Sequence, residues 1–274
     1  APAPAGATIA HYRAEGLDLI PGSGLLSTVI PGAFDAWMLM LRDHGTWPLA
    51  EVLAPALHYA AQGVPLLPRI SAEIAALAGF FRAEWPTSAA TWLPGGHVPE
   101  PGALFRNPDL AATWQRLCAE IAGVPGREAQ IDAARDAFAK GFIAEAIDSY
   151  LRDACVMDAS GQRHKGVLTG QDMAGWRAHY EPALSTNHAN WQIFKGGFWS
   201  QGPVQLQVLD ILGQDPLADL DPLGPDFVHL TIEALKLAFA DREAYYGDAP
   251  GIPAEALLSP AYAAGRRAQI GDHA

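Results

Sequence analysis

The sequence predicts an α+β fold in which helices dominate, and two observations support this. Apolar residues recur at the spacing of one helix face in one segment after another, and the longest such segment spans residues 228–246. One extended run of aromatic and aliphatic residues, 190–194, is the best candidate for a strand. Because 50% of the 274 residues are hydrophobic, the chain can bury a sizeable core.

The N-terminal third is predicted to begin irregularly and then to form three helices. Residues 1–30 show no sustained helical or strand pattern. The first helix ends at Gly45, and its apolar face consists of Phe34, Trp37, Met38 and Leu41. A second helix is expected over 49–59, where the internal Pro55 predicts either a kink or two short helices. A third helix is expected over 70–81.

The middle of the chain is predicted to hold a long loop, two helices and a polar connection. Residues 85–108 are rich in proline and glycine, so they form either a loop that covers a site or a connector along the surface. A helix over 109–122 places Cys118 in its apolar pattern, which is typical of a core thiol. Residues 138–151 carry an amphipathic stripe, and the polar stretch 153–165 is expected to be a loop or a hairpin.

Two helices in the C-terminal half have recognisable first turns. Thr169 can cap a helix, with Asp172 in the place of the usual glutamate of a capping box. The second helix begins near Pro203, because proline suits the first helical position, where its missing N–H is not needed. This helix follows directly on the predicted strand, so the chain is expected to form a strand, a tight turn and a helix in succession.

The turn in this unit is Phe198-Trp199-Ser200-Gln201-Gly202-Pro203. Turns of this type hold side chains and free backbone N–H groups near the end of a sheet, where ligands often bind. The alternative is an ordinary connection between a strand and a helix.

Charge and composition exclude some functions. The net charge is −12, from 30 acidic and 18 basic residues, which argues against a nucleic-acid partner because phosphate binding needs a basic surface. No run of 18 apolar residues is present, so no membrane-spanning helix is expected. Cys118 and Cys155 are too few for a disulfide framework.

Motifs for a metal, a cofactor or a self-contained active site are missing. The nine histidines are scattered, without two at helical spacing and a third ligand close by, so we expect surface or capping histidines and no metal site. The sequence also lacks a phosphate loop and a Gly-x-Ser-x-Gly elbow. We therefore expect no cofactor.

Four charged residues lie on the longest predicted helix: Glu233, Lys236, Asp241 and Arg242. They are expected to form ion pairs that support the fold. An acid–base role is the alternative, and it would require a cleft and shifted pKa values.

Several motifs, in one order along nearly the whole chain, resemble the large subunit of the gamma-glutamyltranspeptidase family, whose members are N-terminal-nucleophile hydrolases. The similar stretches are Val29-Ile30-Pro31-Gly32-Ala33, His44-Gly45-Thr46-Trp47-Pro48-Leu49, Phe138-Ala139-Lys140-Gly141-Phe142-Ile143-Ala144, Leu168-Thr169 with Asp172-Met173-Ala174, and His229, Glu233 and Lys236 followed by Ala240-Asp241-Arg242 and Gly247-Asp248. Each motif is weak alone, and their shared order is what makes the resemblance specific.

The resemblance implies the large-subunit part of a four-layer αββα sandwich, as one domain over 1–274 that lacks its N-terminal part and the small subunit. Members of the family cleave themselves, and a threonine becomes the N-terminus of a separate small subunit. No catalytic residue is therefore expected on this chain. The partners implied are the small subunit and a small amide, with γ-glutamyl compounds such as glutathione as the family's substrates, and a dimer of heterodimers is compatible with the resemblance.

Trp199, Ser200 and Gln201 depart from the family, whose members carry a turn rich in proline, serine and glycine at this point. We predict that these three residues bind substrate, with Trp199 narrowing the cavity and Gln201 adding an amide donor and acceptor. The departure favours an alternative substrate class, small amides such as oxamate-like compounds or cephalosporin side chains.

Two further expectations follow. The two cysteines favour a cytoplasmic location, with the periplasm as the alternative. The alternative function of another class is a non-catalytic helical scaffold or interaction protein.

Overall fold

The structure is a computed structural model that describes residues 2–213 and 217–272. The chain divides into two compact units, Ala1–His179 and Tyr180–Ala274. The prediction of a single domain, an incomplete large subunit, stays a prediction.

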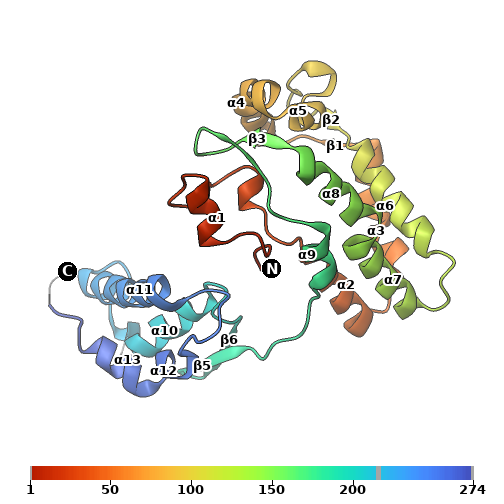
Figure 1. The fold of residues 1–274 in the computed structure, drawn as a ribbon. Coiled ribbons are helices and arrows are strands. Elements are labelled where there is room, and N and C mark those ends of the chain that lie inside the picture. The colour runs from red at the N-terminus through yellow and green to blue at the C-terminus, as the bar shows by residue number, and fades with distance from the viewer. Residues whose placement is uncertain (1, 214–216, 273–274) are drawn as a thin grey trace. The chain divides into compact units, whose positions relative to one another are not determined.

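The first unit is built mainly from helices (Figure 1). The α-helices are α1 (Ile9–Ala14), α2 (Ala33–His44), α3 (Leu49–Gln62), α4 (Pro68–Glu84), α5 (Pro86–Trp92), α6 (Pro108–Ile121), α7 (Arg127–Lys140), α8 (Phe142–Asp153) and α9 (Gly170–Gly175). Two antiparallel ribbons pair β1 (Val64–Pro65) with β2 (Leu104–Phe105) and β3 (Cys155–Met157) with β4 (Arg163–Lys165). Short 3-10 turns lie at Leu25–Ser27 and Pro94–Gly96.

Aromatic stacking organises the main core of this unit, where α2, α3, α6 and α7 meet. The ring of Phe34 stacks on Trp114 and on Phe138, with centroid separations of 5.4 and 4.6 Å. The fully buried Leu117 and Ile131 complete the contact between α6 and α7. Large rings on three helices therefore fix how these helices pack.

Several predictions for this unit are confirmed. Helices cover the segments expected near 34–44, 70–81 and 109–122, and α2 ends at Gly45. The polar stretch 153–165 contains the β3–β4 hairpin. Thr169 and Asp172 form the predicted capping box at the start of α9.

Other predictions for the first third are wrong. The segment 1–30 contains α1, because the Thr8 hydroxyl accepts a hydrogen bond from the N–H of His11 and caps a helix that the apolar pattern does not reveal. Helix α3 runs as one element through Pro55, so the two-helix alternative is wrong. Trp37 lies on the solvent side of α2, with 63% of its surface exposed.

In the middle of the chain, the predicted loop 85–108 contains α5, which begins at Pro86. The stripe over 138–151 belongs to two helices, and they break at Gly141, where a Cβ would lie 2.8 Å from the Ala137 carbonyl oxygen. Cys118 is only partly buried, and this burial raises the pKa of its thiol.

The second unit contains one ribbon and four α-helices in its described residues (Figure 1). Strand β5 (Leu184–His188) pairs antiparallel with β6 (Trp191–Lys195), and Leu184 lies opposite Lys195. The α-helices are α10 (Gly202–Leu212), α11 (Pro225–Tyr245), α12 (Ala254–Leu257) and α13 (Pro260–Arg267), with a 3-10 turn at Leu217–Asp219. The strand predicted at 190–194 is confirmed as β6, whereas sequence patterns did not identify its partner β5.

The core of the second unit lies between α10 and α11. Val204, Val208 and Ile211 of α10 pack with Ala234 and Ala238, which are fully buried on α11. Small residues on α11 let the two helices approach closely. None of the helices in the described ranges combines the length and apolar character that a bilayer crossing requires.

Candidate functional site

The candidate site is the turn between β6 and α10, and two contacts hold it on the end of α11. Phe198 is buried and meets the Tyr246 ring edge-on, with centroids 4.7 Å apart. The N–H of Gly247 donates to the Phe198 carbonyl at 3.1 Å. A Cβ at Gly202 would lie 2.9 Å from the Lys195 Cβ, so this position requires glycine. The turn is therefore rigidly placed, as a binding element would need.

Trp199 lies on the surface of the turn, with 53% of its area exposed. Its indole N–H donates to a Glu181 carboxylate oxygen at 2.8 Å. The ring also lies against Gly197, where a Cβ would come within 3.0 Å of the indole. The indole therefore offers an apolar ring at this surface, while its one donor is already used.

Ser200 is committed to the backbone of its own turn. Its hydroxyl donates to the Gly197 carbonyl at 2.9 Å and accepts from the Gly202 N–H at 3.1 Å. The second bond satisfies an N–H at the start of α10, which otherwise lacks a partner within the helix. Neither contact is with a base, so the geometry does not activate this hydroxyl as a nucleophile.

Gln201 is exposed and contacts the longest helix. Its side-chain oxygen accepts a hydrogen bond from Arg242 Nη1 at 3.1 Å. The same guanidinium donates to the Glu243 carboxylate, with Nε at 3.0 Å, and lies 4.8 Å from the centroid of the Phe239 ring. Arg242 therefore links α11 to the turn.

The structure places Trp199, Ser200 and Gln201 together in this one turn, and their substrate-binding role stays a prediction. Sequence reasoning named Arg242 but did not connect it to the turn, and it missed Glu181. No local pattern could have found these contacts, because they join residues 41 and 18 positions apart in the chain.

The charged residues of α11 form ion pairs, as expected, but in separate groups. Lys236 donates to Glu233 at 2.7 Å, and Arg242 pairs with Glu243. Asp241 is fully buried and accepts from Gln207 and the Tyr262 hydroxyl, each at 2.8 Å, and from Arg266. These contacts connect elements of the unit to one another, which supports the structural interpretation.

The β5–β6 ribbon is held on α10 by Asp210, a carboxyl group with a raised pKa. Burial raises the pKa of Asp210, and the Thr186 hydroxyl of β5 donates a hydrogen bond to it. A raised pKa is typical of functional sites but also of structural polar groups. Because Thr186 is a close partner, we assign this pair to anchoring of the ribbon.

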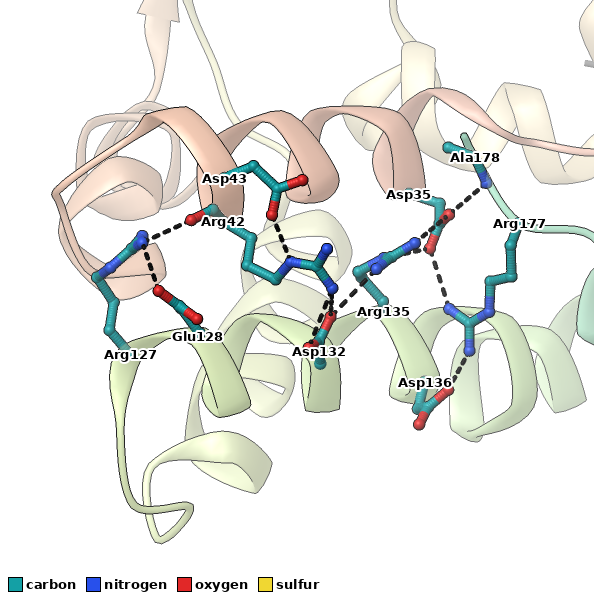
Figure 2. Close-up of polar contacts among 10 residues, drawn as sticks. All are labelled: Asp35, Arg42, Asp43, Arg127, Glu128, Asp132, Arg135, Asp136, Arg177 and Ala178. Carbon is teal, nitrogen blue, oxygen red and sulfur yellow. Dashed lines mark hydrogen bonds and ion pairs between the residues drawn. The ribbon is translucent and has the colours of Figure 1, made fainter. Parts of the chain in front are cut away.

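In the first unit, a cluster of ion pairs surrounds Asp35 (Figure 2). Arg135 donates to its carboxylate through Nε at 2.8 Å and Nη2 at 3.0 Å, Arg177 through Nη1 at 3.0 Å, and the N–H of Ala178 at 2.7 Å. Arg135 also contacts Asp132. The cluster ties α2, α7 and the segment after α9 together. Every donor is matched by a nearby acceptor, as in a structural network.

Among residues 2–213 and 217–272, no group of three histidine, cysteine, aspartate or glutamate side chains could hold a metal ion. His164 differs from the expected surface histidines, because it is buried and its Nδ1 lies 2.6 Å from an Asp158 oxygen. That pair stabilises the β3–β4 hairpin.

A comparison with protein families identifies the chain. The family profile described as Gamma-glutamyltranspeptidase matches residues 1–274. The chain belongs to the gamma-glutamyltranspeptidase family. The resemblance seen in the sequence motifs is therefore confirmed.

Two curated relatives are proenzymes of different names. The chain is 32% identical over 250 residues to the Acylase ACY 1 proenzyme of Pseudomonas sp. (strain SE83), covering 90% of this chain and 40% of the relative. It is 27% identical over 264 residues to the Glutathione hydrolase-like YwrD proenzyme of Bacillus subtilis (strain 168), covering 94% of this chain and 45% of the relative. The chain thus spans less than half the length of the curated relatives it matches.

Solved structures confirm the predicted fold class, with its dominant helices. Two structures of LmbA2991 are each 52% identical, with TM-scores of 0.95 and 0.91, and the matches cover 100% and 99% of this chain and 46% of each solved chain. The cephalosporin acylase from Bacillus halodurans is 26% identical, with a TM-score of 0.79, covering 98% of this chain and 47% of that chain.

Proposed function

We propose that the complete protein is an autoprocessed N-terminal-nucleophile enzyme that hydrolyses an amide bond or transfers its acyl group. The match of the family profile to all of residues 1–274 carries this proposal. The proenzyme names of the relatives support the self-cleavage. In this proposal the present chain supplies scaffold and one wall of the pocket, and its partner is a small subunit that begins with threonine.

The chemistry assigned to that threonine needs no cofactor. Its own α-amine acts as the base for its hydroxyl, which attacks the amide carbonyl. Hydrogen-bond donors stabilise the oxyanion that forms. When it collapses, the carbon–nitrogen bond breaks, the substrate's amine leaves with the proton from the α-ammonium group, and the acyl group stays on the threonine oxygen until water or another amine removes it. The turn at Trp199, Ser200 and Gln201 would contribute shape and polarity to the pocket.

For the substrate we propose γ-glutamyl compounds such as glutathione, which the family's name and the relative named Glutathione hydrolase-like support. The second candidate is the amide of another small acyl group, such as an oxamate-like compound or a cephalosporin side chain. It is favoured by the 32% identity to a protein named acylase and by the exposed indole of Trp199 at the turn.

We further propose a dimer of heterodimers, and a cytoplasmic location with the periplasm as the alternative. Cys118 and Cys155 are free thiols, which suits a reducing compartment. Cell fractionation tests the location, and light scattering of the native preparation tests the assembly.

The first experiment is denaturing intact mass with N-terminal sequencing of the protein from its full-length gene. We expect a second polypeptide that begins with threonine. A single uncleaved polypeptide without such a partner would exclude this mechanism and leave the non-catalytic scaffold as the function.

A substrate panel then separates the two substrate classes. We expect the processed enzyme to release p-nitroaniline from γ-glutamyl-p-nitroanilide. If it leaves that compound and glutathione intact but cleaves oxamate or an acylated cephalosporin, the second candidate replaces the first.

A further inference from the structure

We propose that Gln201 is a specificity-determining hydrogen-bond donor to an oxygen of the substrate's acyl group, and that Arg242 is the residue that positions it. This inference rests on the proposed function and names the chemistry that the turn recognises.

The orientation of the Gln201 amide follows from its partner. An arginine side chain has only donors, so the atom of Gln201 that faces Arg242 Nη1 at 3.1 Å must be the carbonyl oxygen. The amide nitrogen lies on the other branch of the same planar group and directs its two N–H groups away from Arg242. Among the described residues, that nitrogen has no hydrogen-bond partner.

Arg242 is itself held in place, so it can act as a fixed support. Its Nε and Nη2 donate to the Glu243 carboxylate, and its guanidinium lies against the ring of Phe239. The Glu243 charge offsets that of Arg242, so the turn offers an oriented dipole rather than a free cation. Such a dipole suits a carbonyl or carboxylate oxygen.

The neighbouring residues of the turn leave this donor role to Gln201. The Trp199 indole N–H is used by Glu181, and the Ser200 hydroxyl is used by the backbone of Gly197 and Gly202. What Trp199 still offers is an exposed ring. The two residues together match an acyl group with a hydrocarbon part and an oxygen acceptor.

The test replaces the amide N–H donors of residue 201 and keeps the contact of this side chain with Arg242. In Gln201→Glu the side chain still accepts from Arg242, but an acceptor replaces the amide N–H groups. The matched control is Gln205→Glu, which adds the same charge at an exposed position of α10. Glutaryl-p-nitroanilide and pentanoyl-p-nitroanilide serve as probes, because they differ only in the terminal carboxylate.

We expect Gln201→Glu to lower kcat/KM for the glutaryl probe about tenfold or more, mainly through KM, because a hydrogen bond to a charged group is lost. The preference for glutaryl over pentanoyl should shrink, and the thermal midpoint should match that of Gln205→Glu. Arg242→Met should shrink the preference by about half as much on a logarithmic scale, because the amide then loses its fixed orientation but keeps its donors.

The outcomes separate this inference from the proposed function. If the processed wild-type enzyme cleaves amides and Gln201→Glu keeps the wild-type preference, the inference is overturned and the proposed function stands. If Arg242→Met alters the preference while Gln201→Glu does not, Arg242 acts otherwise and the inference also fails. If the wild-type enzyme cleaves none of the amides tested, both fail together.

Discussion

Asp35 in the first unit and Asp241 in the second are both buried, but their carboxylates are satisfied by different chemistry. Asp35 in the first unit, 4% exposed, is bound by two arginines and one backbone N–H. Asp241 in the second unit, 0% exposed, is bound by one arginine, an amide and a tyrosine hydroxyl. The Asp35 carboxylate has two charged partners, both arginines. The Asp241 carboxylate has one charged partner, an arginine, and two neutral donors.

This difference extends to ionisation. Burial alone would raise the pKa of Asp35, but hydrogen bonds from Arg135, Ala178 and Arg177 outweigh it and hold the pKa below its usual value. Beside Asp241, the group with a shifted pKa is the tyrosine that donates to it. Burial, followed by the hydrogen bond to Asp241, raises the pKa of Tyr262. The contacts around Asp35 therefore depend on a carboxylate that stays ionised, and those around Asp241 include a phenol that stays neutral.

The largest expected effect is that of Asp35→Ala, which leaves Arg135 buried beside an empty space. Removing one partner of a buried ion pair costs about 3–5 kcal/mol of folding free energy, because the other charge is left unpaired. Urea unfolding should show this loss of free energy, and hydrogen exchange should show faster opening of α2 and α7.

The control is Glu120→Gln, which breaks an exposed pair with Arg116 and should cost about 0.5 kcal/mol or less. Equal costs for the two variants would show that the Asp35 cluster does not hold the first unit together.

A second, smaller effect is an opposite pH dependence of the contacts around Asp35 and of those around Asp241. Among described residues, the aspartates whose pKa is lowered by hydrogen bonds from side-chain or backbone donors all lie in the first unit: Asp35, Asp136, Asp148, Asp158 and Asp172. A lowered folded-state pKa contributes stability that is present above the unfolded value of about 4 and is lost as pH falls through the folded value.

The shifted pKa of Tyr262 has the opposite effect on the pH dependence of stability. Its raised pKa contributes stability that is fully present below the unfolded value of about 10 and is lost as pH rises through the folded value. Hydrogen exchange resolved by segment should show α2 and α7 opening more readily in acid than at neutral pH, and α11 and α13 opening more readily in alkali. Equal sensitivity of the two pairs of helices to acid and to alkali would contradict this assignment.

The comparison also shows how far the sequence could predict the structure. Helical periodicity placed α2, α4, α6 and α11, because each buries one face and the pattern is local. It missed α7, since Ile131 is the one large apolar residue among those that this helix buries, and the others are small or charged: Ala134, Arg135 and Ala139. It also missed β5, because a single five-residue strand with alternating burial resembles a loop when its partner is unknown.

The candidate site likewise has a part that local sequence patterns predict and a part that depends on distant residues. The turn at 198–203 could be predicted, because Gly202 and Pro203 are local signals for the start of a helix. Its contacts with Glu181 and Arg242 depend on tertiary packing. For the same reason the sequence pointed to Asp241, through a motif, but not to Asp35, whose arginine partners lie 100 and 142 residues away.

The smallest expected effect comes from a neutral donor to Asp241, the hydroxyl of Tyr262. Tyr262→Phe removes the hydroxyl that donates to Asp241 and accepts from Arg266 Nε at 3.1 Å, while Arg266 and Gln207 remain bound to the carboxylate. We expect a loss of about 1 kcal/mol in urea unfolding, close to the net value of one hydrogen bond. The alkaline loss of stability in the second unit should also weaken, because the phenol that would ionise is gone. Tyr245→Phe, an exposed tyrosine on the same unit, should change neither quantity. A cost of 3 kcal/mol or more for Tyr262→Phe would mean that the second aspartate depends on its hydroxyl as strongly as the first depends on its arginines, and the contrast between the two units would be lost.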